Sequence, residues 1–232
     1  MRAHRGSSAE TWFTGKAHLR RWYRRRIDWS VFHFLNHLFA GHALVEDEIG
    51  DFTSDWAVPL FAAATIALWF LDRPGRGYRW KIASLAGLTA AGLGLAIGQV
   101  ITHFWQRPRP FVAHPHETIL LVPPSHEPSF PSDHAIAAFA IAFAVAFVGR
   151  RVGALFLAGA TLIVVARVMS GLHYPGDVLG GLAIGLASAA VVRWLAETQL
   201  AALVRLVSRL SDPLVAPGWQ AFDRLKARRR TP

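Results

Sequence analysis

The sequence predicts an all-α fold, a polytopic membrane bundle of six transmembrane helices with amphipathic ends on the cytoplasmic side. Two observations lead to this fold class. The 232 residues are 53% hydrophobic and 17% charged, and the apolar residues gather in repeated segments of helical length. Lys and Arg residues lie mainly between these segments, as they do in multi-spanning membrane proteins. A chain of this size accommodates one compact membrane domain and no second sizeable core.

Six apolar segments are the expected spans. They cover residues 29–44, 56–71, 82–105, 133–148, 152–169 and 177–195. Several are shorter than the roughly 20 residues of a full crossing, so we expect tilted helices or snorkelling side chains at their ends. Gly94 and Gly98, like Gly181 and Gly185, have the spacing that lets neighbouring helices approach closely.

The first of these segments is more polar than an ordinary span. It contains His33, Asn36, His37 and His42, for which hydrogen bonds between helices are a better explanation than catalysis. The acidic residues that follow, between positions 46 and 55, are expected to form a solvated outer loop.

The basic residues predict how the chain is oriented. They occupy the N-terminal arm, residues 73–81, residues 150–151 and the C-terminal tail, whereas the alternate loops are acidic or carry polar motifs. By the positive-inside rule, both termini are expected in the cytoplasm and the polar motifs on the outer face of the membrane.

The two ends of the chain are expected to lie on the membrane surface. Residues 1–27 form a basic arm that we expect to be an interfacial helix, with a disordered solvated arm as the alternative. Residues 28–197 form the membrane domain, and residues 198–232 a basic tail whose leucine spacing predicts an amphipathic helix. Contacts with anionic lipid explain the net charge of +10, and no nucleic-acid partner is expected. The chain has no cysteine, which excludes disulfides and thiolate chemistry.

A polar cluster between the fifth and sixth spans holds Arg167, His173 and Asp177. Charge at the end of a span is costly enough to indicate function. An Asp four residues after a His can hold the imidazole in one tautomer and leave its other nitrogen free to attack. The alternative is a short polar loop in which Asp177 only caps the next helix.

Two earlier clusters, residues 106–111 and 130–135, complete the expected site. Arg109, together with Arg167, offers a permanently charged guanidinium fork that suits phosphate oxygens. Ser132 and the amides of a helix N-terminus offer further donors, although Ser132 also suits the N-cap of the fourth span.

These residue types predict phosphoryl transfer. His173 can attack phosphorus, while His134 protonates the leaving oxygen and then activates water. Arg107 either binds a second phosphate or anchors its loop at the headgroups. Gly171 is also expected to bind the substrate phosphate. The arginines supply the positive field, so neither metal nor cofactor is expected.

The three clusters resemble the signature of the type-2 phosphatidic acid phosphatase superfamily, whose motifs run Lys-x6-Arg-Pro, Pro-Ser-Gly-His and Ser-Arg-x5-His-x3-Asp. The matching residues are Arg109 and Pro110, then Pro131, Ser132 and His134, then Arg167, His173 and Asp177. Thr102 replaces the lysine, Asp133 the glycine and Ala166 the serine. Gln99 or His103 could stand in for the lysine as a donor.

The wider pattern is similar to the bacterial undecaprenyl-diphosphatase branch of that superfamily. The resemblance implies a multi-pass enzyme of the bacterial inner membrane that removes the terminal phosphate of undecaprenyl diphosphate at the periplasmic face, for cell-wall synthesis. Phosphatidylglycerophosphate or another glycerolipid phosphate would use the same pocket. A non-catalytic lipid-phosphate binder is the alternative from another class, but a binder needs only the cations. A zinc site is the rival enzymatic interpretation, with candidate ligands His103, His114, His116 and His126.

Overall fold

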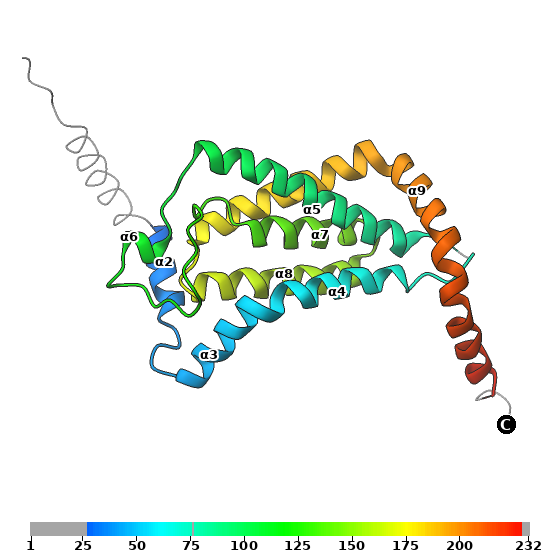
Figure 1. The fold of residues 1–232 in the computed structure, drawn as a ribbon, viewed down its shortest axis with the longest axis horizontal. Helices are drawn as coiled ribbons and strands as arrows, with labels where there is room; N and C mark the ends of the chain where they lie inside the picture. Colours follow the sequence, from blue (N-terminus) through cyan, green and yellow to red (C-terminus); the bar gives the residue numbers. More distant parts are fainter. Residues whose placement is uncertain (1–26, 76, 229–232) are drawn as a thin grey trace, which may run out of the picture.

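The computed structural model describes residues 27–75 and 77–228, and every regular element within them is helical. The elements are α2 (Ile27–Asn36), α3 (Ala43–Asp51), the π-helix η1 (Phe52–Trp56), α4 (Ala57–Trp69), α5 (Arg79–Phe104), α6 (Pro110–Ala113), α7 (Asp133–Val148), α8 (Arg150–Met169) and α9 (Pro175–Arg228). The long helices run side by side, α2 and α6 lie at one end of the bundle, and the last part of α9 crosses the other end (Figure 1). The all-α prediction is confirmed for these residues.

Helix α7 lies at the centre of the bundle and packs against α5, α8 and α9. Its residues are small or apolar, and glycines on its neighbours bring the helices close. A Cβ at Gly185 of α9 would lie 2.8 Å from backbone atoms of Ala140 and Ile136, and one at Gly94 or Gly98 of α5 would lie 2.6 Å from the Ile136 side chain. The predicted role of the four-residue glycine spacing is therefore confirmed.

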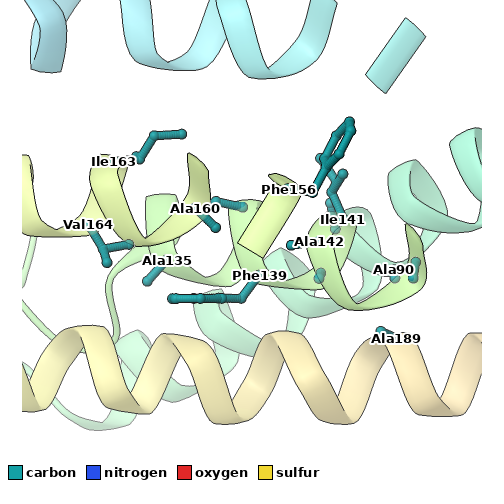
Figure 2. Packing of buried hydrophobic residues seen from close by; sticks show 14 of the residues in the cluster. Ala90, Ala135, Phe139, Ile141, Ala142, Phe156, Ala160, Ile163, Val164 and Ala189 are labelled. Atoms are coloured by element: carbon teal, nitrogen blue, oxygen red, sulfur yellow. The ribbon is translucent and has the colours of Figure 1, made fainter. Parts of the chain in front are cut away.

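The hydrophobic core extends from α7 through α8 towards α4. In Figure 2, Phe156 and Ile163 of α8 point towards α4, whereas Phe139 of α7 lies on the side that faces α9. Phe156 meets Phe61 of α4 edge to face, with ring centroids 5.3 Å apart. This packing fixes the helix ends that carry the polar motifs.

The prediction of one helix over residues 29–44 is wrong. Helix α2 ends at Asn36, and a turn containing Gly41 at φ +82° precedes α3. Ten residues of α-helix rise only about 15 Å, half of a hydrocarbon core, and α2 lies across the end of the bundle (Figure 1). Asn36 is buried and bonds to the backbone of Met169 and Ile119. Its predicted structural role is confirmed by the bond to Met169 of α8. The second partner, Ile119, lies in the connection between α6 and α7.

The acidic segment from 46 to 55 is helical rather than a loop. It belongs to α3 and η1, which run directly into α4. The π-turn lies just before Pro59, which has no amide to donate to the carbonyl one turn back. The acidic side chains still reach the surface, because Asp47, Glu48 and Asp51 are all exposed.

Three of the described helical segments are long and apolar enough to cross a membrane: Arg79–Phe104, Arg150–Met169 and Pro175–Trp194. Two shorter apolar helices, Ala57–Trp69 and Asp133–Val148, lie beside them. The predicted count of six spans is thus not established.

The tail differs from the expected separate helix, because α9 continues without a break from Pro175 to Arg228. Its last part is held against the α4–α5 connection. Lys81 pairs with Asp212, and Arg73 pairs with Asp223 at 3.0 Å. The predicted basic arm lies, apart from Ile27, outside the described residues.

Candidate active site

The three polar clusters converge at the end of the bundle where α2 and α6 lie (Figure 1). One comes from the segment after α5, one from the segment that leads into α7, and one from the turn between α8 and α9. A backbone bond from Ser132 N to Asp177 O, 3.2 Å long, joins the second and third segments. Residues distant in sequence therefore share one site.

Asp177, in the first turn of α9, is the buried centre of this site. Its side chain has no exposed surface. Oδ2 accepts hydrogen bonds from Ser129 Oγ at 2.6 Å and Tyr174 N at 2.8 Å, and Oδ1 accepts one from Arg107 Nη1 at 2.6 Å. Asp177 does cap its own helix through Tyr174, but its contacts with Ser129 and Arg107 go well beyond capping.

His173 is held in one tautomer, although not directly by Asp177. Its Nδ1 lies 2.9 Å from the carbonyl oxygen of Ser129, which can only accept a hydrogen bond. Nδ1 must therefore carry the proton, and Nε2 keeps its lone pair. The nearest Asp177 oxygen is 4.0 Å from Nδ1. Ser129, whose hydroxyl binds Asp177 and whose carbonyl binds His173, is the connecting residue that sequence reasoning missed.

The surroundings of His173 favour the neutral imidazole. The side chain is 3% exposed, and its burial, with the positive charges of Arg109 and Arg167, lowers the pKa of His173 well below the ordinary 6.5. Nε2 lies 3.5 Å from Arg109 Nη1. An unprotonated nitrogen beside a fixed cation, whose guanidinium can bind the incoming phosphate, suits attack on an anionic phosphorus centre.

Arg109 is fixed by the backbone on both sides of the site. Its Nε donates to Glu127 O at 2.7 Å and its Nη1 lies 3.4 Å from Leu172 O. The residue is 5% exposed. Its charge and that of Arg167 act on both His134 and His173. The structure thus brings together both histidines and two of the expected phosphate-binding arginines.

Two buried donors in the site have no hydrogen-bond partner among the described residues: Arg167 Nε and Ser132 Oγ. Ser132 stands at the N-cap position of α7, yet its hydroxyl makes no capping bond. Buried polar groups are normally paired, because leaving one unpaired costs about 1–3 kcal/mol. Phosphate oxygens are acceptors that would satisfy both groups.

Two residues expected to bind phosphate have other contacts here. Arg107 places its guanidinium between Asp177 and Asp28, and over the ring of Tyr174 at 4.0 Å. Gly171 adopts φ +81°, and a Cβ there would lie 2.5 Å from the carbonyl oxygen of Ile119. Backbone conformation and close packing explain this glycine without a ligand.

Two of the three positions that depart from the motifs, Thr102 and Asp133, lie where α5 contacts the segment that leads into α7. Thr102, in place of the lysine, points its hydroxyl at Phe130 O, 3.4 Å away. Gln99 Nε2 donates to Asp133 Oδ2 at 3.2 Å. Gln99 thus contacts Asp133, the residue that replaces the glycine of the second motif. Among residues 27–75 and 77–228, no three His, Asp or Glu side chains are grouped to hold a metal ion.

Comparison with known proteins gives one consistent result. The PAP2 superfamily matches residues 80–201. Undecaprenyl-diphosphatase BcrC of Bacillus subtilis is 36% identical over 157 residues, which cover 68% of this chain and 76% of that protein. Lipid A 1-phosphatase of Rhizobium etli is 35% identical over 153 residues, 64% of this chain and 58% of that protein. The crystal structure of Aquifex aeolicus LpxE has a TM-score of 0.56 and 26% sequence identity, covering 72% of this chain and 94% of that one.

Apolar helices, with buried arginines and a histidine gathered at one end of the bundle, are the features expected of a membrane phosphatase. The chain belongs to the PAP2 superfamily of membrane lipid phosphatases. The family assignment made from the motifs is confirmed, and with it the prediction of a hydrolase.

Proposed function

We propose that this protein removes the terminal phosphate of undecaprenyl diphosphate through a phosphohistidine at His173. The observation that carries the proposal is the arrangement of His173 Nε2, neutral and buried, 3.5 Å from the guanidinium of Arg109. The similarity to undecaprenyl-diphosphatase BcrC supports this substrate.

In the first step, His173 Nε2 forms a bond to the terminal phosphorus while the bond from phosphorus to the bridging oxygen breaks. With the anionic diphosphate bound, its negative charge offsets the charges of Arg109 and Arg167, and His134 carries a proton. His134 gives this proton to the bridging oxygen, and undecaprenyl phosphate leaves. Arg109, Arg167 and Ser132 donate to the phosphoryl oxygens, where charge develops in the transition state.

In the second step, water attacks the phosphohistidine and gives its proton to His134. The bond between phosphorus and Nε2 breaks, its electron pair returns to nitrogen, and inorganic phosphate leaves. Both histidines are then in their starting states. Throughout, Ser129 O holds the proton on Nδ1 at 2.9 Å, so that Nε2 remains the reacting atom.

We further propose that the site lies at the outer face of the cytoplasmic membrane. The basic connections at residues 73–81 and 149–151 lie at the end of the bundle away from α2 (Figure 1), so the positive-inside rule puts that end and the end of α9 in the cytoplasm. Because α2 does not span, we infer five crossings, with α3 and η1 extending α4. Ile27 then lies at the outer face, which departs from the expected cytoplasmic N-terminus. A reporter fused after Pro232 should be active only inside the cell.

The substrate is tested by phosphate release from the purified protein in detergent. Undecaprenyl diphosphate is compared with phosphatidylglycerophosphate and with a lipid A 1-phosphate, the glycolipid phosphate that the Rhizobium relative's name suggests. We expect the highest kcat/KM for the polyprenyl diphosphate, and activity that a chelator does not reduce. A preference for either other lipid would leave the chemistry in place and refute the proposed substrate.

A further inference from the structure

Arg107 joins the catalytic region to a helix outside the three motifs. Its Nη1 donates to Asp177 Oδ1 and its Nη2 to Asp28 Oδ2 of α2, both at 2.6 Å. The Arg107 side chain is 10% exposed, against 0% for the side chain of Asp177 and 20% for that of Asp28. Charge-assisted hydrogen bonds of this length are roughly twice as strong as neutral ones, and removing one partner of a largely buried pair leaves an uncompensated charge.

Asp28 also contacts the first turn of α9, which carries Asp177. Its Oδ1 accepts a hydrogen bond of 2.7 Å from Gly176 N, next in sequence to Asp177. A Cβ at Gly176 would lie 3.0 Å from Asp28 Oδ2. One carboxylate therefore contacts the backbone that carries Asp177 and the arginine that binds its side chain.

The geometry requires an arginine at position 107. A guanidinium is planar and presents separate Nη groups in a fixed fork, so it can bind two carboxylates at once. Bound to Asp28 through Nη2, it donates to Oδ1 of Asp177 through Nη1. Oδ2 of Asp177 thus remains available to Ser129 Oγ and Tyr174 N.

We propose that Asp28 and Arg107 are positioning residues that hold Asp177 and, through Ser129, the tautomer and orientation of His173. The connection runs from Asp28 to Arg107, Asp177, Ser129 O and finally His173 Nδ1. Asp28 lies outside residues 80–201, where the family matches. The inference rests on the proposed nucleophilic role of His173.

This role differs from substrate binding and from simple anchoring of α2. A phosphate-binding arginine would change KM when replaced, whereas a positioning arginine changes kcat, because Arg109, Arg167 and Ser132 still bind the phosphate. Anchoring is shared with Asn36 at the other end of α2, which bonds to Met169 O at 2.7 Å. Losing Asp28 should therefore leave α2 attached.

The test measures kcat and KM for phosphate release by Asp28→Asn, Asp28→Glu, Arg107→Gln and the Asp28→Asn/Arg107→Gln double variant. The matched control is Asp223→Asn, which removes the exposed pair with Arg73 at the far end of the bundle. We expect Asp28→Asn to lower kcat by about 10- to 100-fold, as replacing an outer partner of an active-site ligand does, with KM within about twofold. Asp28→Glu should recover part of the loss, and the control should match the wild type.

The double variant separates coupled from independent action. If Asp28 acts through Arg107, the double variant should lose little more than Arg107→Gln alone. Additive losses would overturn the proposal, as would a rise in KM that accounts for the whole effect. Wild-type kcat per folded molecule in Asp28→Asn would also overturn it.

A second measurement does not depend on the substrate. Nitrogen-15 shifts of the His173 imidazole, assigned by comparison with His173→Ala, should report a proton on Nδ1 in the wild type and a tautomer mixture in Asp28→Asn. Unchanged shifts would refute the positioning role even if undecaprenyl diphosphate were not the substrate. A wild-type protein that does not hydrolyse undecaprenyl diphosphate would instead count against the proposed function.

Discussion

Replacing Ser129 with alanine tests the connection between Asp177 and His173. The change removes the Oγ donor 2.6 Å from Asp177 Oδ2 but keeps the carbonyl that binds His173. A hydrogen bond to a charged group contributes about 1.5–3 kcal/mol. If that energy is lost only in the transition state, kcat falls by about 10- to 150-fold, because about 1.4 kcal/mol corresponds to tenfold.

The assay is steady-state phosphate release in detergent, with kcat and KM determined separately for each variant. We expect kcat to fall and KM to stay near the wild-type value, because Ser129 touches no group assigned to phosphate. Ser125→Ala is the matched control from the same segment, since its hydroxyl accepts a hydrogen bond of 3.3 Å from the amide of Glu127, a residue given no catalytic role. If Ser129→Ala turns over as fast as Ser125→Ala, the connecting role of Ser129 is refuted.

Three further changes probe the donors, the charge and the packing. Ser132→Ala should lower kcat/KM without lowering the melting temperature, since the hydroxyl has no hydrogen-bond partner within residues 27–75 and 77–228; a lower melting temperature would contradict this. Because burial lowers the pKa of His173, the free enzyme keeps this imidazole neutral as the pH falls through 6.5, so the decline of kcat/KM that accompanies protonation of His173 should lie below that value; a decline on lowering the pH that begins above 6.5 would count against it. Gly185→Ala should destabilise the bundle by about 1–3 kcal/mol, because its Cβ would meet α7 backbone at 2.8 Å, whereas Gly92→Ala, with nothing within 4 Å, should not. Equal melting temperatures for these two variants would refute the packing argument.

The sequence was most informative where one residue type had one explanation. An apolar run predicted α7 with its correct ends, because the run lies between Ser132 and Gly149 and contains no glycine or proline. The clusters around Arg109, His134 and His173 were identified by spacing and chemistry, and the fold brings them to one end of the bundle.

The failures have physical causes that the local sequence does not show. Residues 29–44 have the composition of a span, but Asn36 is used by tertiary hydrogen bonds and the chain turns at Gly41. Helix α9 also continues through Pro213 and Pro217, although proline usually ends or kinks a helix. Its contacts with Lys81 and Arg73 come from distant segments, and helix propensity carries no information about them.

The parts of the site that were missed depend on contacts over long sequence distances. Arg107 was equally compatible with phosphate and with headgroups, and only its position between Asp28 and Asp177 distinguishes a third role. Ser129 carried one weak signal, a hydroxyl three residues before Ser132. The direct Asp177–His173 contact expected from a four-residue spacing is replaced by a connection through Ser129, because the helix turn directs the carboxylate to Tyr174 N.

The most direct test of the account is to trap the covalent intermediate. Purified protein is mixed with undecaprenyl diphosphate, quenched in alkali, where phosphohistidine survives, and digested for mass spectrometry of the peptide that contains His173. The account predicts a phosphoryl group on His173 that is absent from His173→Ala. His134→Ala removes the acid of the first step and the base of the second. If the second step is slowed more than the first, the phosphorylated form of His173 accumulates in this variant. Turnover without a phosphoryl group on His173, or with the group on another residue, would contradict the central claim.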